Sequence, residues 1–307
     1  MIKVAHLTKR FVQQVAVDDL SFTIEPGEVV GFLGPNGAGK STTMKMLTGF
    51  LQPCEGSVSI CGFDISKQTL KAQRQIGYLP EGAPCYGDMS VLGFLTFIGQ
   101  IRGYRGKELQ QRIARAIDLV ELDRVVEQNI ETLSKGFKRR VGLAQAVLHD
   151  PKVLILDEPT DGLDPNQKHQ VRKLIKSLAV DRIVIISTHI LEEVSALCTR
   201  AMVINQGRLL IDETPYELQS RSRYHQAVTI LSDQPLDRKL LQAVPGVIAI
   251  EDNPLDGSLT LLAEAGQVIF PAVNQLIYAQ GWQVRELEVE RGRLDEVFRS
   301  LTRGDVA

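Results

Sequence analysis

The sequence predicts an α/β protein built around a mostly parallel, covered sheet. Two observations lead to this fold class. Short apolar β segments alternate with segments of helical period over much of the 307-residue chain. A glycine-rich loop, Gly34 to Ser41, stands between an apolar run and a helix-compatible segment. Because alternating strands and helices cover both faces of a parallel sheet, we expect its strands to be buried.

The first third of the chain is predicted to be rich in strands. Strands are expected around the turn Glu25-Pro26-Gly27, at Ile2–Leu7, Ala16–Ile24 and Val29–Leu33. A helix over Ser41–Leu47 and a strand at Gly56–Cys61 follow. The middle third changes to helical periodicity, with helices expected at Val91–Arg102, Gly106–Val120 and Ser134–Leu148.

The pattern then returns to alternating strands and helices. Strands are expected at Val153–Leu156, Ile183–Ser187 and Ala201–Asn205, with helices at Asn166–Leu178 and Leu191–Cys198. A domain boundary is predicted near residues 220–224, which gives domains of 1–220 and 224–307, with a helical subdomain at about 88–148 in the first. The second domain has the predicted order β-α-β-β-α-β, which is typical of a ferredoxin-like α+β fold. Its elements are expected at His225–Leu231, Pro235–Val244, Ile248–Glu251, Ser258–Leu262, Val268–Ala279, Gln283–Val289 and Leu294–Leu301, the last being a further helix.

Composition narrows the function classes. The hydrophobic fraction of 44% and charged fraction of 23% are those of an ordinary globular protein, and a net charge of −2 gives no basic field for nucleic acid. The four cysteines form no C-x-x-C pair, so free thiols are expected rather than zinc ligands. No run approaches the roughly 18 apolar residues of a membrane span. If the protein functions at a membrane, another chain would have to supply the membrane-spanning segments.

The segment Gly34 to Ser41 fits G-x-x-x-x-G-K-[ST]. Glycines let the backbone turn its N–H groups toward an anion, and the helix that follows adds partial positive charge. Lys40 is placed to reach the β- and γ-phosphates and the Ser41 hydroxyl to bind Mg²⁺. A hairpin loop that merely contains a lysine is disfavoured by the strand before and the helix after.

Two strand ends carry further candidate residues. The apolar run Val153–Leu156 ends in Asp157 and Glu158, which suits a buried strand that delivers carboxylates to the ligand-binding edge of a sheet. Asp157 is suited to a Mg²⁺ site and Glu158 to polarising a water. His189 follows another β-rich run and is expected at the same edge. Taken singly, the two acids would fit a solvated acidic turn equally well, and a lone histidine is more often structural than functional.

Leu133-Ser134-Lys135-Gly136-Phe137 opens a basic helix and forms a second candidate anion site, because Ser134 is a good N-cap. With this segment, the motif order resembles the nucleotide-binding subunit of ATP-binding cassette (ABC) transporters over residues 1 to about 220. The resemblance implies a P-loop NTPase with a RecA-like core, an antiparallel β subdomain and a helical subdomain. It also implies ATP and Mg²⁺ as ligands.

The resemblance implies a role for each matching residue. Phe11 occupies the position of the aromatic residue that stacks on adenine. Glu158, His189 and Lys40 are assigned to ATP hydrolysis. The phosphates are wrapped by Gly34, Pro35, Asn36, Gly37, Ala38, Gly39, Lys40, Ser41 and Thr42. Ser134 and Gly136 act on the γ-phosphate of the opposite protomer, and Asp164 communicates across the dimer. Mg²⁺ is assigned to Ser41, Glu81 and Asp157.

Two departures point to the type-2 exporter branch, similar to gliding-motility and multidrug or antibiotic export ATPases. Lys135 and Phe137 replace the first Gly and the Gln of Leu-Ser-Gly-Gly-Gln, and Glu81 replaces a Gln. The resemblance further implies a head-to-tail homodimer, a multi-span permease partner and a cytoplasmic location at the inner membrane face. A non-transport ATPase of the same superfamily and a regulatory nucleotide sensor are the alternatives; one phosphate loop and the absence of a long heptad array disfavour the first.

Overall fold

The computed structural model describes residues 1–83 and 85–303 and divides the chain into two compact units, Met1–Glu213 and Thr214–Ala307. The predicted boundary near residues 220–224 lies just after α8 (Pro215–Ser220), the first helix of the second unit. None of the helices among the described residues has the length and apolarity needed to cross a bilayer.

A six-stranded sheet forms the centre of the first unit, in the order β10-β9-β3-β8-β7-β6. Five of its strands are parallel to their neighbours, and only the edge strand β10 runs antiparallel. The strands are β3 (Val29–Leu33), β6 (Ile76–Leu79), β7 (Val153–Asp157), β8 (Ile183–Thr188), β9 (Arg200–Asn205) and β10 (Arg208–Glu213). The mostly parallel sheet confirms the predicted fold class.

Both faces of this sheet are covered, because its strands are apolar at successive positions. In β7, Val153 and Ile155 face one core while Leu154 and Leu156 face the other, and all four are buried. The first core includes α1 (Lys40–Leu47) and an antiparallel sheet of order β2-β1-β4-β5. Those strands are β1 (Ile2–Phe11), β2 (Gln14–Ile24), β4 (Glu55–Ile60) and β5 (Phe63–Asp64).

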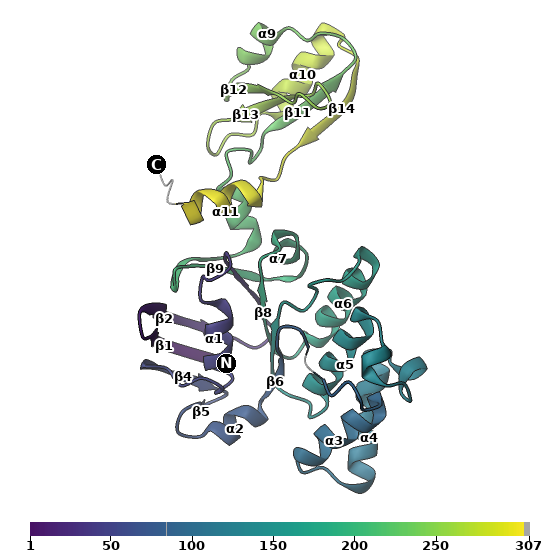
Figure 1. Ribbon diagram of the computed structural model, residues 1–307. Helices are drawn as coiled ribbons and strands as arrows, with labels where there is room; N and C mark the ends of the chain where they lie inside the picture. Colours follow the sequence, from purple (N-terminus) through teal and green to yellow (C-terminus); the bar gives the residue numbers. More distant parts are fainter. Residues whose placement is uncertain (84, 304–307) are drawn as a thin grey trace. The chain divides into compact units, whose positions relative to one another are not determined.

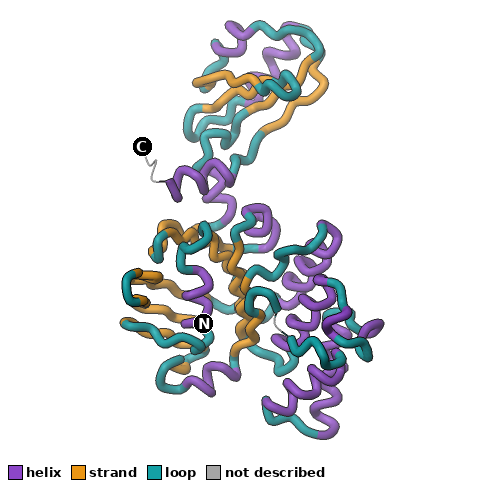
Figure 2. The backbone as a smooth tube through the Cα atoms, viewed as in Figure 1, coloured by secondary structure: helices purple, strands orange, loops and turns teal. Residues whose placement is uncertain are grey.

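Helices cover the opposite face, as Figure 1 and Figure 2 show. They are α3 (Val91–Ile101), α4 (Gly106–Leu119), α5 (Lys135–Val147) and α6 (Pro165–Leu178), with short turns η1 (Asp123–Val125) and η2 (Ile130–Thr132) between α4 and α5. Helix α7 (Leu191–Leu197) follows β8. Helix α2 (Thr69–Arg74) and strand β6 were not among the predicted elements.

The second unit contains a four-stranded antiparallel sheet with the order β12-β13-β11-β14. Its elements follow the predicted β-α-β-β-α-β sequence: β11 (Val228–Ser232), α9 (Arg238–Gln242), β12 (Val247–Asp252), β13 (Leu259–Ala263), α10 (Phe270–Gln280) and β14 (Val284–Val289). Helix α11 (Leu294–Arg303) ends the described chain. Helix α9 is shorter than the predicted 235–244, because Asp237 caps its start by accepting bonds from the N–H groups of Lys239 and Leu240.

Candidate functional site

Four neighbouring parallel strands, in the order β3-β8-β7-β6, bring the predicted residues to one edge of the central sheet. Each strand is followed at its carboxyl end by one predicted element: the phosphate loop after β3, His189 after β8, Glu158 after β7, and Glu81 near the end of β6. Since Leu33 pairs with Thr188 and Asp157 with Ser187, these ends lie at the same level. The phosphate loop, Glu81, Glu158 and His189 are far apart in the sequence but therefore converge where ligands bind in open α/β sheets.

The phosphate loop depends on glycine at two tight positions. A Cβ at Gly34 would lie 2.3 Å from the carbonyl oxygen of Ile204, and one at Gly39 would lie 2.4 Å from that of Ala16. Gly39 also has φ of +104° and begins α1 with no side-chain cap. The first N–H groups of α1 are thus left to an external acceptor, as an anion site requires.

Lys40 is buried and donates through Nζ to the carbonyl oxygens of Gly34 at 2.7 Å and Pro35 at 3.1 Å. Burial lowers the pKa of Lys40, an effect that the nearby carboxylates of Glu158, Asp157 and Glu81 oppose. The ammonium group therefore bonds to neutral main-chain oxygens and has three carboxylates within electrostatic range.

The end of β7 holds two carboxylates in different surroundings. Asp157 is 2% exposed and accepts a bond from the Ser187 hydroxyl of β8. Glu158 adopts a left-handed backbone with φ of +48°, a strained conformation for a non-glycine residue that often marks functional sites. Its Oε1 lies 2.9 Å from Nδ1 of His189, and its Oε2 is buried without a partner. One oxygen of Glu158 therefore has an unused capacity to accept a hydrogen bond.

Two further residues face this carboxylate cluster and were missed from the sequence. Burial, together with Asp157 and Glu81, raises the pKa of Tyr78 to about 12. Arg139 of α5 is 6% exposed, and its buried Nη1 has no partner. Burial lowers the pKa of Arg139, while Asp161, Glu158, Glu81 and Asp157 counteract that effect. Its position on the buried stripe of α5, three residues after Gly136, is the signal that could have identified it.

The segment Leu133–Phe137, which corresponds to Leu-Ser-Gly-Gly-Gln in the ABC family and is called the signature segment below, lies at the exposed start of α5. Ser134 caps this helix, with its Oγ accepting a bond from the N–H of Phe137. A Cβ at Gly136 would lie 2.7 Å from the side-chain amide carbon of Gln167. The main-chain N–H of Gln167 donates to Oδ1 of Asp164 at 2.9 Å. The starts of α5 and α6 therefore pack together. Ser134 and Asp164 are both exposed.

Most of the remaining predicted residues are at least partly exposed in the first unit, whereas Ala38 is buried in the phosphate loop. Phe11 ends β1 with 46% of its surface exposed, and the Lys9 ammonium lies 5.5 Å from its ring centre. Asn36 and Glu81 are exposed, and Ser41 and Thr42 are partly exposed in the first turn of α1.

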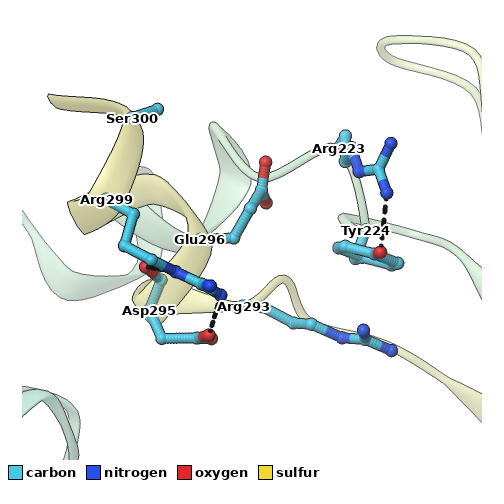
Figure 3. A pocket seen from close by; sticks show the side chains of 7 residues that line it. All are labelled: Arg223, Tyr224, Arg293, Asp295, Glu296, Arg299 and Ser300. Atoms are coloured by element: carbon cyan, nitrogen blue, oxygen red, sulfur yellow. Dashed lines mark hydrogen bonds and ion pairs between the residues drawn. The ribbon is translucent and has the colours of Figure 1, made fainter. Parts of the chain in front are cut away.

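A separate cluster of charges lies in the second unit, around an open cavity of about 400 Å³ (Figure 3). The Tyr224 ring lies between the guanidinium groups of Arg223 at 4.9 Å and Arg293 at 3.7 Å. Every arginine of the lining has a carboxylate partner: Arg223 pairs with Glu251, Arg293 with Glu290 and Arg299 with Asp295. These pairs leave little net positive charge for a ligand.

A phosphate loop between β3 and α1, with an acidic strand end and a histidine at the same sheet edge, defines a P-loop ATPase. Residues 17–161 match the family model described as "ABC transporter". The chain is 34% identical, over 98% of its length and 96% of the relative's, to "Uncharacterized ABC transporter ATP-binding protein YhcH" of Bacillus subtilis. It therefore belongs to the ATP-binding proteins of ABC transporters, which bind and hydrolyse ATP.

Two further likenesses are to a relative named for export and to a solved dimeric structure. The chain is 31% identical, over 98% of its length and 97% of the relative's, to "Nod factor export ATP-binding protein I" of Cupriavidus metallidurans. A solved structure described as the "dimeric structure of a post-hydrolysis state of the ATP-binding cassette MJ0796 bound to ADP and Pi" matches with a TM-score of 0.64 and 25% identity. That match covers 70% of this chain and 99% of the other.

Proposed function

We propose that this protein hydrolyses ATP to power export through separate membrane-spanning subunits, from a cytoplasmic position on the inner face of the membrane. The Glu158–His189 pair beside the phosphate loop carries the proposal, since Glu158 keeps a buried oxygen without a partner. Export is inferred from the relative whose name describes Nod factor export.

ATP would be held by the first unit in two ways. The loop N–H groups between Gly34 and Thr42 and the start of α1 would bind its phosphates, and Lys40 would exchange its bonds to main-chain carbonyls for phosphate oxygens. That exchange is favourable because the ammonium group attracts negatively charged phosphate oxygens more strongly than neutral carbonyl oxygens. Phe11, half-exposed at the end of β1, would stack on the adenine.

Hydrolysis would use Glu158 as the general base. Its free Oε2 would accept a hydrogen bond from the attacking water and take up the proton as the water oxygen bonds to the γ-phosphorus. The His189 ring, held at Oε1 of Glu158, would contact the γ-phosphate. The bond between the γ-phosphorus and the β–γ bridging oxygen breaks, giving ADP and inorganic phosphate.

The oxygen donors at the sheet edge fit a Mg²⁺ ion, which prefers carboxylate and hydroxyl oxygens. Ser41, Asp157 and Glu81 would hold it, and Asp157 is already oriented by the Ser187 hydroxyl. When bound, the ion would neutralise negative charge on the phosphates.

The exposed signature segment would complete the site of a second copy. Ser134 is exposed at the start of α5, and Gly136 and Asp164 both lie next to Gln167. We propose a head-to-tail homodimer with two ATP molecules between the protomers, as the dimeric state of the related cassette supports. Residues from Glu81 to Gly103 would transmit dimer closure to a multi-span permease.

The test combines turnover with membrane association. The tagged chain, expressed in its native host, should co-purify from membranes with a multi-span protein, and the complex should hydrolyse ATP. Glu158→Gln should abolish hydrolysis and leave the association intact. A chain recovered only from the soluble fraction with full turnover would contradict the transport role, and wild-type turnover in Glu158→Gln would contradict the assigned base.

A further inference from the structure

We propose that Glu193 is a positioning residue for hydrolysis: its buried carboxylate fixes the turn that carries His189 and thereby holds the imidazole against Glu158. The inference rests on the proposed function, because it assigns a supporting role in that same site. Glu193 lies in the first turn of α7, four residues after His189, and is 1% exposed.

Three hydrogen bonds close the turn between β8 and α7. Oε2 of Glu193 accepts a bond of 2.8 Å from the Thr188 hydroxyl, and that hydroxyl accepts a bond of 3.0 Å from the N–H of Ile190. The N–H of Glu193 donates to the carbonyl oxygen of Ile190 at 3.1 Å. Thr188 is itself held by the sheet through its pairing with Leu33. The backbone of His189 is thus enclosed by bonds that begin and end at Glu193.

His189 contributes the exposed side chain of this turn. Its ring is 49% exposed, and the bond of its Nδ1 to Glu158 fixes only one end of the side chain. The direction of its Cα–Cβ bond therefore depends on the backbone of residues 188–190. A displacement of about 1 Å at a catalytic contact can reduce the rate about a hundredfold, so the rigidity of this turn has functional weight.

Packing alone does not account for a carboxylate at position 193. A buried charge is costly unless it is paired, and Oε1 of Glu193 is buried without a hydrogen-bond partner. Burial raises the pKa of Glu193, and the nearby carboxylate of Glu158 adds to that effect, while Thr188, Arg172 and Lys168 oppose it. A leucine would fill the same space without this cost. The carboxylate is therefore best explained by the bond that it accepts from Thr188.

Arg172 of α6 supplies the compensating charge. It bonds to Glu192 through Nη1 at 2.8 Å, while its Nε and Nη2 are buried without partners. These donors and Oε1 of Glu193 lie where α6 packs on α7. Helix α6 begins at the Asp164 cap, so the same contact joins the histidine turn to the helix that follows the Asp164 loop.

The test is a double-mutant cycle with His189, measured as steady-state ATP hydrolysis by the full-length chain. Glu193→Ala should lower kcat about five- to fiftyfold and leave KM for ATP within twofold. In a His189→Ala background, the same substitution should lower kcat no further than twofold, because its effect passes through the histidine. Equal losses in both backgrounds would overturn the positioning role.

Two conservative variants keep the test valid if Glu193→Ala folds poorly. Glu193→Gln should retain at least a third of the wild-type kcat, since its amide oxygen can accept the Thr188 hydrogen. Thr188→Val, which removes that donor at nearly constant volume, should reproduce the kcat loss. Glu192→Ala, on the exposed side of the same helix turn, is the matched control and should stay within twofold of wild type.

The possible results separate the two proposals. A Glu193→Gln variant as impaired as a folded Glu193→Ala, or a fully active Thr188→Val, would overturn the role of Glu193 while leaving the ATPase assignment intact. A wild-type chain that binds ATP without turnover would contradict the proposed function itself.

Discussion

The two units of this protein each gather charged side chains in one place, but they pair those charges differently. In the second unit, each arginine around the cavity of Figure 3 bonds to a carboxylate of the same unit. At the sheet edge of the first unit, Lys40 bonds only to main-chain oxygens. Two further atoms there, Nη1 of Arg139 and Oε2 of Glu158, are buried without a hydrogen-bond partner.

This difference separates charges that serve the fold from charges reserved for a ligand. A buried polar atom without a partner costs about 1–3 kcal/mol, so several such atoms at one site indicate that the free protein is not the state for which the site is arranged. Paired charges carry no such indication. The predictions below test this rule, beginning with the largest expected effect.

Glu158→Gln should produce the largest change. Replacing the carboxylate removes the base, so kcat for ATP hydrolysis should fall at least about a hundredfold, because a general base typically contributes that much to a rate. ATP binding should persist and an ATP-bound dimer should accumulate, as measured by size-exclusion chromatography with Mg²⁺-ATP. The matched change in the second unit, Glu251→Gln, should leave kcat within twofold, and a comparable loss there would break the comparison.

Lys40→Ala should weaken ATP binding. The lost charge-assisted bonds, about 2 kcal/mol, correspond to roughly a thirtyfold rise in Kd by titration with a fluorescent ATP analogue. Arg299→Ala removes a cation of the second unit that is already paired with Asp295, so it should leave Kd unchanged. An affinity loss in both variants would show that pairing does not distinguish the two clusters.

His149 marks a limit of the rule, because it has a buried Nδ1 without a partner and lies among the helices rather than at the site. Burial and the neighbouring Arg102 lower its pKa from 6.5 to about 4, opposed by the bond between Nε2 and the carbonyl oxygen of Ile76. The unfolded chain therefore takes up this proton first, and stability is lost as pH falls from about 6.5 toward 4. Urea unfolding should show a loss of about 2 kcal/mol between pH 7.5 and 5 from this residue.

His149→Gln should remove that part of the pH dependence. The quantity to compare is the change of the unfolding free energy with pH in the wild type and in the variant, because the glutamine variant will also lose stability at all pH values. An unchanged slope would mean that His149 accepts its proton in the folded state without penalty.

Lys135→Gly should have the smallest effect. Lys135 opens α5 on the exposed surface, and the end of its side chain lies near Gly162. Removing an exposed charge there is expected to change the free energy of ATP-driven dimerisation by about 0.5 kcal/mol, roughly twofold in the dimer constant. Analytical ultracentrifugation with Glu158→Gln as background would measure it, and a tenfold change would place Lys135 in the composite site.

Much of the architecture could be predicted because its signals are local. The strand at Val29–Leu33 matches β3 residue for residue, and the predicted central helices begin and end within one residue of α3, α4 and α5. Strand β6 was missed because it is short and contains Gly77, which weakens a strand pattern. That glycine is required by a tertiary contact, since a Cβ there would lie 2.1 Å from the carbonyl oxygen of Ala146.

The site was predictable in its motifs and not in its connections. Lys40, Glu158 and His189 follow strands whose ends could be expected to meet. The bond of Ser187 to Asp157, the burial of Arg139 and the bond of Thr188 to Glu193 depend on side-chain directions that are set only when the sheet and helices pack. Polar residues inside apolar patterns mark such positions, but the sequence does not name their partners.

The hydrogen bonds that connect the phosphate loop to the turn between β9 and β10 have a consequence for synthesis of the chain on the ribosome. The N–H of Gly207, in the turn between β9 and β10, donates to Ala38 at 2.9 Å, and its carbonyl oxygen accepts from Asp18 at 3.0 Å. Ribosomes synthesise residue 207 long after residue 38, because the chain emerges from its N-terminus. A nascent chain of 200 residues would contain the complete phosphate-loop sequence while lacking the turn that braces it. ATP binding should therefore become possible only late in synthesis, when nearly all of the first unit has left the ribosome.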